Sequence, residues 1–140
     1  TVTGVQTCAL PICLLAVHAL LLLDVHQSWA WFVIISNGLA GLWSLTAHKY
    51  EAVRSRALWW FTAVAEFTMF VQVVMGVTLI NKYKLQAPQF HMFYGFVGLI
   101  AIAILYSYRS QLKHKLYLLY GFGGLFVMGL GIRAMLVGKR

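Results

Sequence analysis

Two histidines next to long apolar runs are the residues of this sequence that are best suited to chemistry. His26 precedes the run that begins at Trp29, and His91 follows Pro88 at the start of another run. If both runs are helices that point the same way, the two imidazoles lie at a similar depth. Axial ligation of a haem iron uses one imidazole nitrogen from each side of the macrocycle. The spacing therefore predicts a haem b site with His26 and His91 as ligands.

The neighbourhood of these histidines is open to two interpretations. Arg133 is expected in the same half of the structure, where it could neutralise a haem propionate, and Gly95 and Gly98 would leave room for a flat macrocycle. The alternative needs no cofactor, because histidines at a membrane edge can hydrogen-bond to headgroups or backbone. A second pair, His48 and His114, is flanked by lysines and is expected among lipid headgroups rather than at a metal.

One carboxylate, that of Glu66, lies inside an apolar run. A charged side chain at the centre of a bilayer costs about 3 kcal/mol on insertion scales. Glu66 is therefore expected to be protonated, paired, or in contact with a wet cavity. Asn37, at a similar depth in the preceding run, is its expected partner. The buried polar pair of Glu66 and Asn37 predicts either a hydrogen bond that links two helices or a site that handles protons or cations.

The composition indicates that lipid is the solvent for these groups. Of 140 residues, 61% are hydrophobic and 10% are charged, whereas soluble domains carry about 25% charged residues. The formal charge of +8 could suggest nucleic acid, but the basic residues form short clusters between apolar runs. Such clusters determine topology and contact anionic lipids, so we expect a lipid bilayer as partner and no nucleic acid.

Four apolar runs are long enough to cross a bilayer, which takes about 20 helical residues. They cover approximately residues 29–47, 57–80, 89–108 and 115–137. Short connections make consecutive helices antiparallel neighbours. The predicted fold is thus an all-α membrane protein, an up-down-up-down four-helix transmembrane bundle. The run over 12–23 is too short to span, so it is expected as a short extra apolar N-terminal helix.

Small and polar residues mark the faces that pack against other helices. Asn37, Gly41, Ser44 and His48 recur on one helical face of the first span. Gly121, Gly124 and Gly131 do the same in the last span. Because small residues let helix backbones approach closely in lipid, both faces are expected to point inward.

The basic residues also predict the orientation. One side of the predicted bundle carries six of them and the other carries four. The richer side has Lys49, Arg54, Arg56, Arg109, Lys113 and Lys115, and the poorer side has Lys82, Lys84, Lys139 and Arg140. By the positive-inside rule, the loops 48–56 and 109–115 are cytoplasmic.

Three motifs carry a resemblance. The segments His26–Trp31, Val71–Leu79 and Gln89–Met92 resemble the first, second and third helices of small bacterial four-helix integral membrane proteins, which are largely uncharacterised. Their layout is loosely similar to that of cytochrome b561. The resemblance implies a multi-pass protein of the bacterial inner (plasma) membrane. Residues 1–12 instead resemble a translated sequencing adapter, so a single transmembrane domain is expected over 13–140.

Three functions follow from these observations. Short loops and small-residue faces favour a non-enzymatic scaffold or accessory subunit of a membrane complex, possibly respiratory, that contacts other membrane subunits or copies of itself. The first alternative is an electron-transfer protein with haem b between His26 and His91. The second is a small transporter or proton pathway that uses Glu66.

Overall fold

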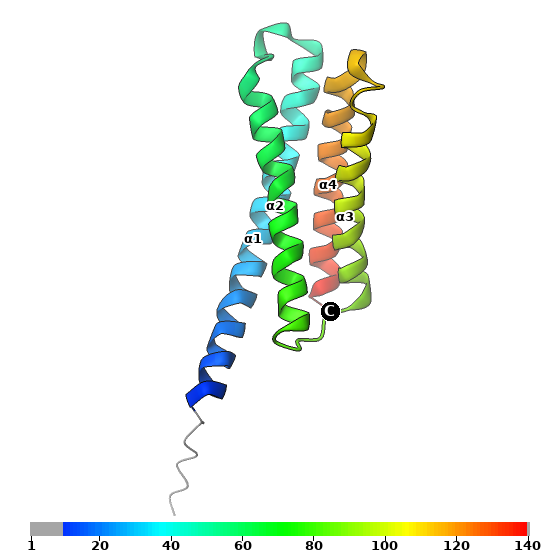
Figure 1. Cartoon of the computed structure of the whole chain (residues 1–140). Coiled ribbons are helices and arrows are strands. Elements are labelled where there is room, and N and C mark those ends of the chain that lie inside the picture. The colour runs from blue at the N-terminus through cyan, green and yellow to red at the C-terminus, as the bar shows by residue number, and fades with distance from the viewer. Residues whose placement is uncertain (1–9, 140) are drawn as a thin grey trace, which may run out of the picture.

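A computed structural model describes residues 10–139, with side chains from residue 12 onward. Four α-helices make up most of this part, and it contains no strand. The helices are α1 (Leu10–Lys49), α2 (Arg56–Asn81), α3 (Gln89–Tyr108) and α4 (Leu116–Gly138), with 3₁₀ turns at Glu51–Val53 and Lys113–Lys115 (Figure 1). All four α-helices are long and apolar enough to cross a membrane. Residues 1–9, which hold most of the adapter-like segment, lie outside the described part.

Local signals explain where the inner helices begin. The Ser55 hydroxyl accepts a hydrogen bond from the Leu58 N–H at 3.3 Å, which caps the first turn of α2. Pro88 precedes α3, and its carbonyl accepts the first helical bond, from the Met92 N–H at 3.2 Å. A proline is tolerated there because N–H groups at a helix start have no partner within the helix.

The expected separate N-terminal helix was wrong, because α1 runs without interruption through residues 10–49. Asp24, Gln27 and Ser28 are exposed on its surface and do not break it. The only proline of α1, Pro11, lies in its first turn, where the missing N–H does no harm. The resulting helix of 40 residues is about 60 Å long, twice the hydrocarbon thickness of a bilayer of about 30 Å.

The helices do not pack in the order of the chain. α1 makes its most extensive contact with α4, α2 packs against α1, and α3 packs against α4. α2 and α3, although consecutive, scarcely touch (Figure 1). The α1–α2 and α3–α4 connections lie at the top of Figure 1, and the α2–α3 connection and the end of α4 lie at the bottom.

Glycines bring α1 and α4 together, and the predicted small-residue faces of both helices point inward. A Cβ atom at Gly124 would lie 2.8 Å from the Asn37 carbonyl oxygen and 3.0 Å from the Gly41 Cα. Gly121 and Gly131 meet side chains of α1 in the same way. The prediction that His48 points inward with this face was wrong, because the residue is exposed at the end of α1.

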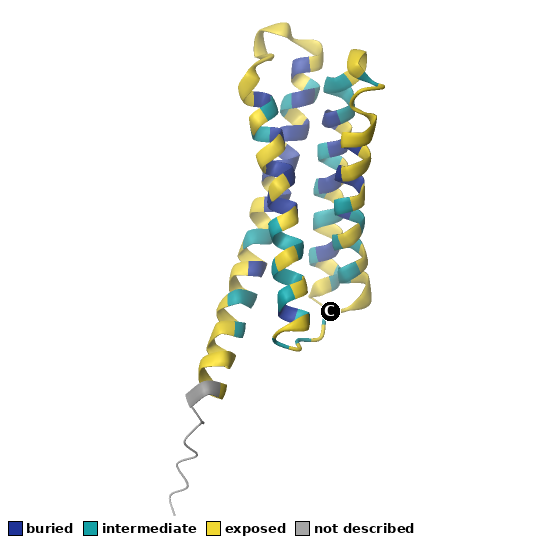
Figure 2. Ribbon diagram, viewed as in Figure 1, coloured by how far each residue is buried: buried dark blue, intermediate teal, exposed yellow. Residues whose placement is uncertain are grey.

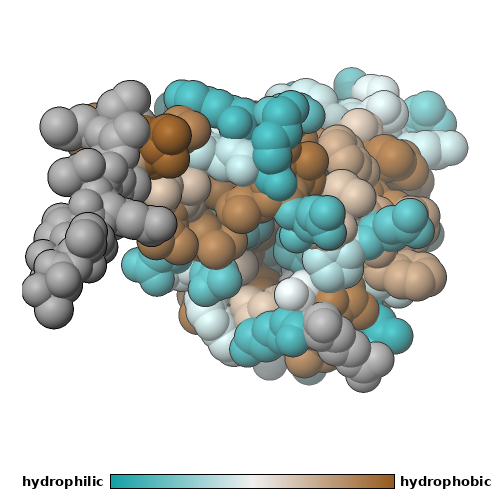
Figure 3. Space-filling view, turned by 90° about the horizontal axis from the view of Figure 1, so that it is seen from below, coloured by the Kyte–Doolittle hydropathy of each residue, from teal (hydrophilic) through white to brown (hydrophobic). Residues whose placement is uncertain are grey.

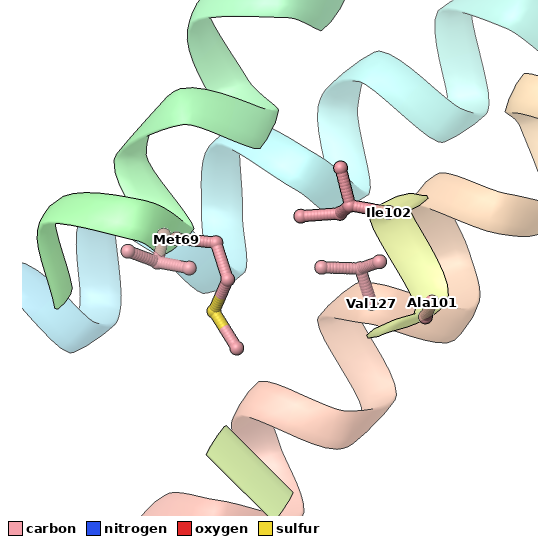
Figure 4. Close-up of a cluster of buried hydrophobic side chains, with 5 residues drawn as sticks. Met69, Ala101, Ile102 and Val127 are labelled. Atoms are coloured by element: carbon pink, nitrogen blue, oxygen red, sulfur yellow. The ribbon is translucent and has the colours of Figure 1, made fainter. Parts of the chain in front are cut away.

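All four helices contribute to the core. Val33, Met69, Ala101, Ile102 and Val127 form its buried cluster (Figure 4). Most large apolar side chains elsewhere point outward, and Figure 2 shows exposed positions along the outside of every helix. Such an apolar exterior is unusual in soluble monomers and suits a lipid environment.

Candidate functional site

The histidines predicted as a pair lie next to each other. His26 projects from α1 and His91 from the first turn of α3. Their ring centres are 6.0 Å apart, and the ring planes are inclined at 69°. The helices that carry them, α1 and α3, hardly contact each other, so the two rings meet between these helices. Residues of α2 and α4 orient the rings.

α2 surrounds the imidazole of His26, which is 9% exposed. The Gln72 amide donates to the His26 backbone carbonyl at 3.0 Å and lies 3.4 Å from its Nε2. A Cβ atom at Gly76 would stand 3.2 Å from the His26 Cε1, so the glycine makes room for the ring. The His26 Nδ1 and the Gln72 Oε1 are buried without a hydrogen-bond partner among the described residues.

α4 holds the imidazole of His91. The Nδ1 of His91 lies 2.9 Å from the backbone carbonyl oxygen of Ala134. Since a carbonyl can only accept, Nδ1 must carry the proton and donate it, which leaves Nε2 as a free lone pair. A carbonyl that fixes the tautomer of a histidine in this way is the usual support for a metal ligand. Gly138 lets the ring approach, because its Cβ would lie 2.7 Å from that Nδ1.

Both rings line one cavity of about 150 Å³ at the end of the bundle that carries the α2–α3 connection. Its walls come from all four helices and are mostly apolar. Besides the histidines and Gln72, they include Val33, Met69, Val73, Gly76, Met92, Gly95, Phe96, Gly131 and Met135. Figure 3 looks onto this end of the molecule and shows hydrophobic surface between hydrophilic groups.

The number of ligands suits a haem iron better than a bare metal ion. No group of three or more His, Cys, Asp or Glu side chains could hold a metal within the described residues. Protein zinc sites use at least three such ligands, whereas a haem iron takes four from the macrocycle and needs only the axial pair. His26 and His91, whose ring centres are 6.0 Å apart, would be the two protein ligands of such an iron.

Arg133 does not join this site. Its side chain is exposed on α4 and is not part of the cavity wall. Residues 85–87 of the α2–α3 connection line the cavity. The same connection carries two basic residues, Lys82 and Lys84.

Glu66 and Asn37 are both buried, at 8% and 1% exposed, but they are not hydrogen-bonded to each other. The Asn37 amide donates to the carbonyl oxygens of Val33 and Ala65, both at 2.9 Å. It therefore links α1 to the main chain of α2. Glu66 faces a separate cleft towards the other end of the bundle.

Sequence reasoning gave no role to Gln72 or to Ala134. Gln72 had a usable signal, because it lies in an apolar run one turn before Gly76, so both share a helical face. The role of Ala134 belongs to its backbone carbonyl, which no residue type reveals.

Comparisons of this chain with models of protein families, with curated proteins and with solved structures give no match.

Proposed function

We propose that this chain is a membrane protein that binds haem b between His26 and His91 and carries single electrons. The observation that carries the proposal is the 6.0 Å between the two imidazole centres, inside a mostly apolar cavity. Bound there, a haem would supply one-electron chemistry, with a potential tuned by its axial ligands and surroundings.

The side chains and backbone of the site have distinct tasks. His26 and His91 would provide the axial nitrogens. The carbonyl of Ala134 keeps the His91 proton on Nδ1 and aims Nε2 at the cavity. The hydrogen bond from Gln72 to the His26 carbonyl links α1 to α2 and so holds the His26 ring in position along the bundle axis. The mostly apolar walls would limit the access of water to a bound haem.

We further propose that the four helices span the bacterial inner membrane in the order up, down, up, down. The loops 48–56 and 109–115 would be cytoplasmic, because they carry more basic residues than the opposite side. The histidine pair, near the start of α3 and the end of α4, would then lie close to the outer face.

An absorption spectrum of the protein, purified in mild detergent after expression with ample haem, tests the proposal. We expect a Soret band and, after reduction, a sharp α-band. His26→Ala or His91→Ala should remove at least nine-tenths of this absorption, because each leaves the iron one axial ligand short. His48→Ala and His114→Ala are matched controls, since both histidines are exposed. A protein without a Soret band, or one that keeps it in both alanine variants of the pair, would contradict haem binding here.

A second candidate role is that of an accessory subunit in a membrane complex. The first part of α1 extends beyond the other helices (Figure 1), and it exposes large apolar side chains, among them Ile12, Leu14, Leu15, Leu20 and Leu21. Such a surface calls for cover by lipid or by another chain. A photo-crosslinking residue at Leu20 should yield one discrete heavier product in native membranes, and one at Lys113 should not. Crosslinks to lipid alone would argue against this role.

A further inference from the structure

Glu66 lines a second cavity, which plays no part in the proposed haem site. Its side chain is 8% exposed, and within the described residues it makes no hydrogen bond. It faces a cleft of about 410 Å³ bounded by α2, α3 and α4. The residue as a whole is buried, but its carboxyl oxygens are open to the cleft, so this side chain is placed to meet something that enters it.

The cleft is separate from the histidine cavity. Met69 lies one turn after Glu66 and packs against Gly98 of α3. Met69 also belongs to the buried cluster that joins all four helices. The two cavities therefore lie on opposite sides of one layer of the core, with Glu66 on one side and Gln72 on the other.

Aromatic rings form the walls around Glu66. The cleft is lined by Trp59, Trp60, Tyr106 and Tyr120. Trp59 and Tyr120 meet edge to face, with ring centres 5.5 Å apart. Aromatic walls of this kind receive flat rings well, because stacked and edge-to-face contacts are both favourable.

The charged groups at the cleft restrict the chemical class of ligand that it can bind. Arg56 and Arg109 also line it and are exposed. The guanidinium of Arg109 lies 4.8 Å from the ring centre of Tyr106. Two arginines disfavour a cation, whereas the carboxyl group of Glu66, when ionised, disfavours an anion. A neutral ligand that carries oxygen atoms satisfies both, because guanidinium groups donate to oxygen and a carboxyl group can donate or accept.

The cleft lies at the poorly packed boundary of the bundle. α2 and α3 scarcely touch, and Trp60 on this boundary is 70% exposed. In a membrane that side faces lipid, so a ligand can enter from the bilayer with a hydrocarbon tail left outside. The volume is within the range of about 300–1,000 Å³ that is typical of small-molecule sites.

We propose that this cleft binds the head group of a lipid-soluble quinone, with the ring against Trp59 and Tyr120 and one ring oxygen at Glu66. Arg109 donates to the other oxygen. The site does not depend on haem, and a chain without haem would bind the same ligand.

The test uses the full chain in phosphatidylcholine nanodiscs, without added haem, and a decyl-substituted benzoquinone as probe. We expect saturable quenching of tryptophan fluorescence. Glu66→Leu and Arg109→Gln should each weaken binding about tenfold, the factor that corresponds to about one hydrogen bond. Glu51→Gln and Arg133→Gln are matched controls, since both residues lie outside the cleft, and they should bind like the unaltered protein.

Two results would overturn the proposal. One is quenching that rises linearly with the probe and is equal in all variants, which means partition into lipid only. The other is displacement of the probe by the lipophilic cation tetraphenylphosphonium, which means a cation site. Arg109 is exposed, so its variant decides the matter even if Glu66→Leu fails to fold. The haem spectrum is recorded separately, so failure of either site is distinguishable from failure of the other.

Discussion

At the residue scale, the buried amide of Asn37 links two helices by hydrogen bonds. It holds two carbonyl oxygens at once, one on its own helix and one on α2. The sequence correctly placed Asn37 and Glu66 at a similar depth, since depth follows from counting residues along a helix. It could not reveal that Asn37 prefers the main chain, because rotation about the helix axes decides which groups meet.

Asn37→Ala should therefore lower the free energy of unfolding by about 1–2 kcal/mol, since an interhelical hydrogen bond is lost and a buried carbonyl of α2 loses a donor. Glu66→Gln is the matched comparison and should change it by less than about 0.5 kcal/mol, as the carboxyl group has no protein partner to lose. Unfolding of both variants in mixed detergent micelles, followed by circular dichroism, measures the difference. If the double variant differs in its free energy of unfolding from the sum of the two single effects, the two side chains interact after all.

At the scale of helices, the contact between α1 and α4 depends on glycine. The helix bounds themselves were largely predictable: the three later spans agree with the structure to within a residue or two, because apolar runs and their basic flanks mark them. The glycine faces were predictable from periodicity as well. The continuity of α1 was not predicted, because Asp24 and its neighbours looked like a break although none of them stops a helix.

Gly124→Ala should destabilise the protein by about 1–3 kcal/mol, because the new methyl group meets backbone atoms of α1 that cannot move aside cheaply. Gly129→Ala is a matched control on the same helix. Nothing lies within 4 Å of its added Cβ, so this variant should be neutral or up to about 1 kcal/mol more stable through higher helix propensity. Thermal midpoints of the two variants in one detergent give the comparison, and equal midpoints would mean that α1 and α4 do not approach so closely.

For the whole molecule, the all-α class with four long apolar helices and the pairing of His26 with His91 could be predicted. Which helices pack against each other could not. Composition indicates a membrane protein, and counting residues along the helices predicts that His26 and His91 lie at one level. Which helices touch depends on side-chain shape across several helices at once. The separation of α2 from α3, and with it the cleft at Glu66, has no counterpart in sequence periodicity.

The proposed orientation can be tested with single cysteines in a chain whose Cys8 and Cys13 are replaced by serine. In intact bacterial cells, an impermeant maleimide should label a cysteine at Lys84 and should not label one at Ser110 until the membrane is opened. The reason is that Ser110 lies in a loop of the more basic side. The reverse pattern would place the histidine pair near the cytoplasm.

The pairing of α1 with α4 has a consequence for biosynthesis. The first and last helices of the chain make its most extensive contact, so the largest interface has the greatest sequence separation. Contacts of this kind form late and slow folding, because the intervening chain must be ordered first. During synthesis, Gly41 and its neighbours have no partner on α4 until Gly124 has been made. Until then α1 can pack only against α2, and both cavities are complete only once α4 is present.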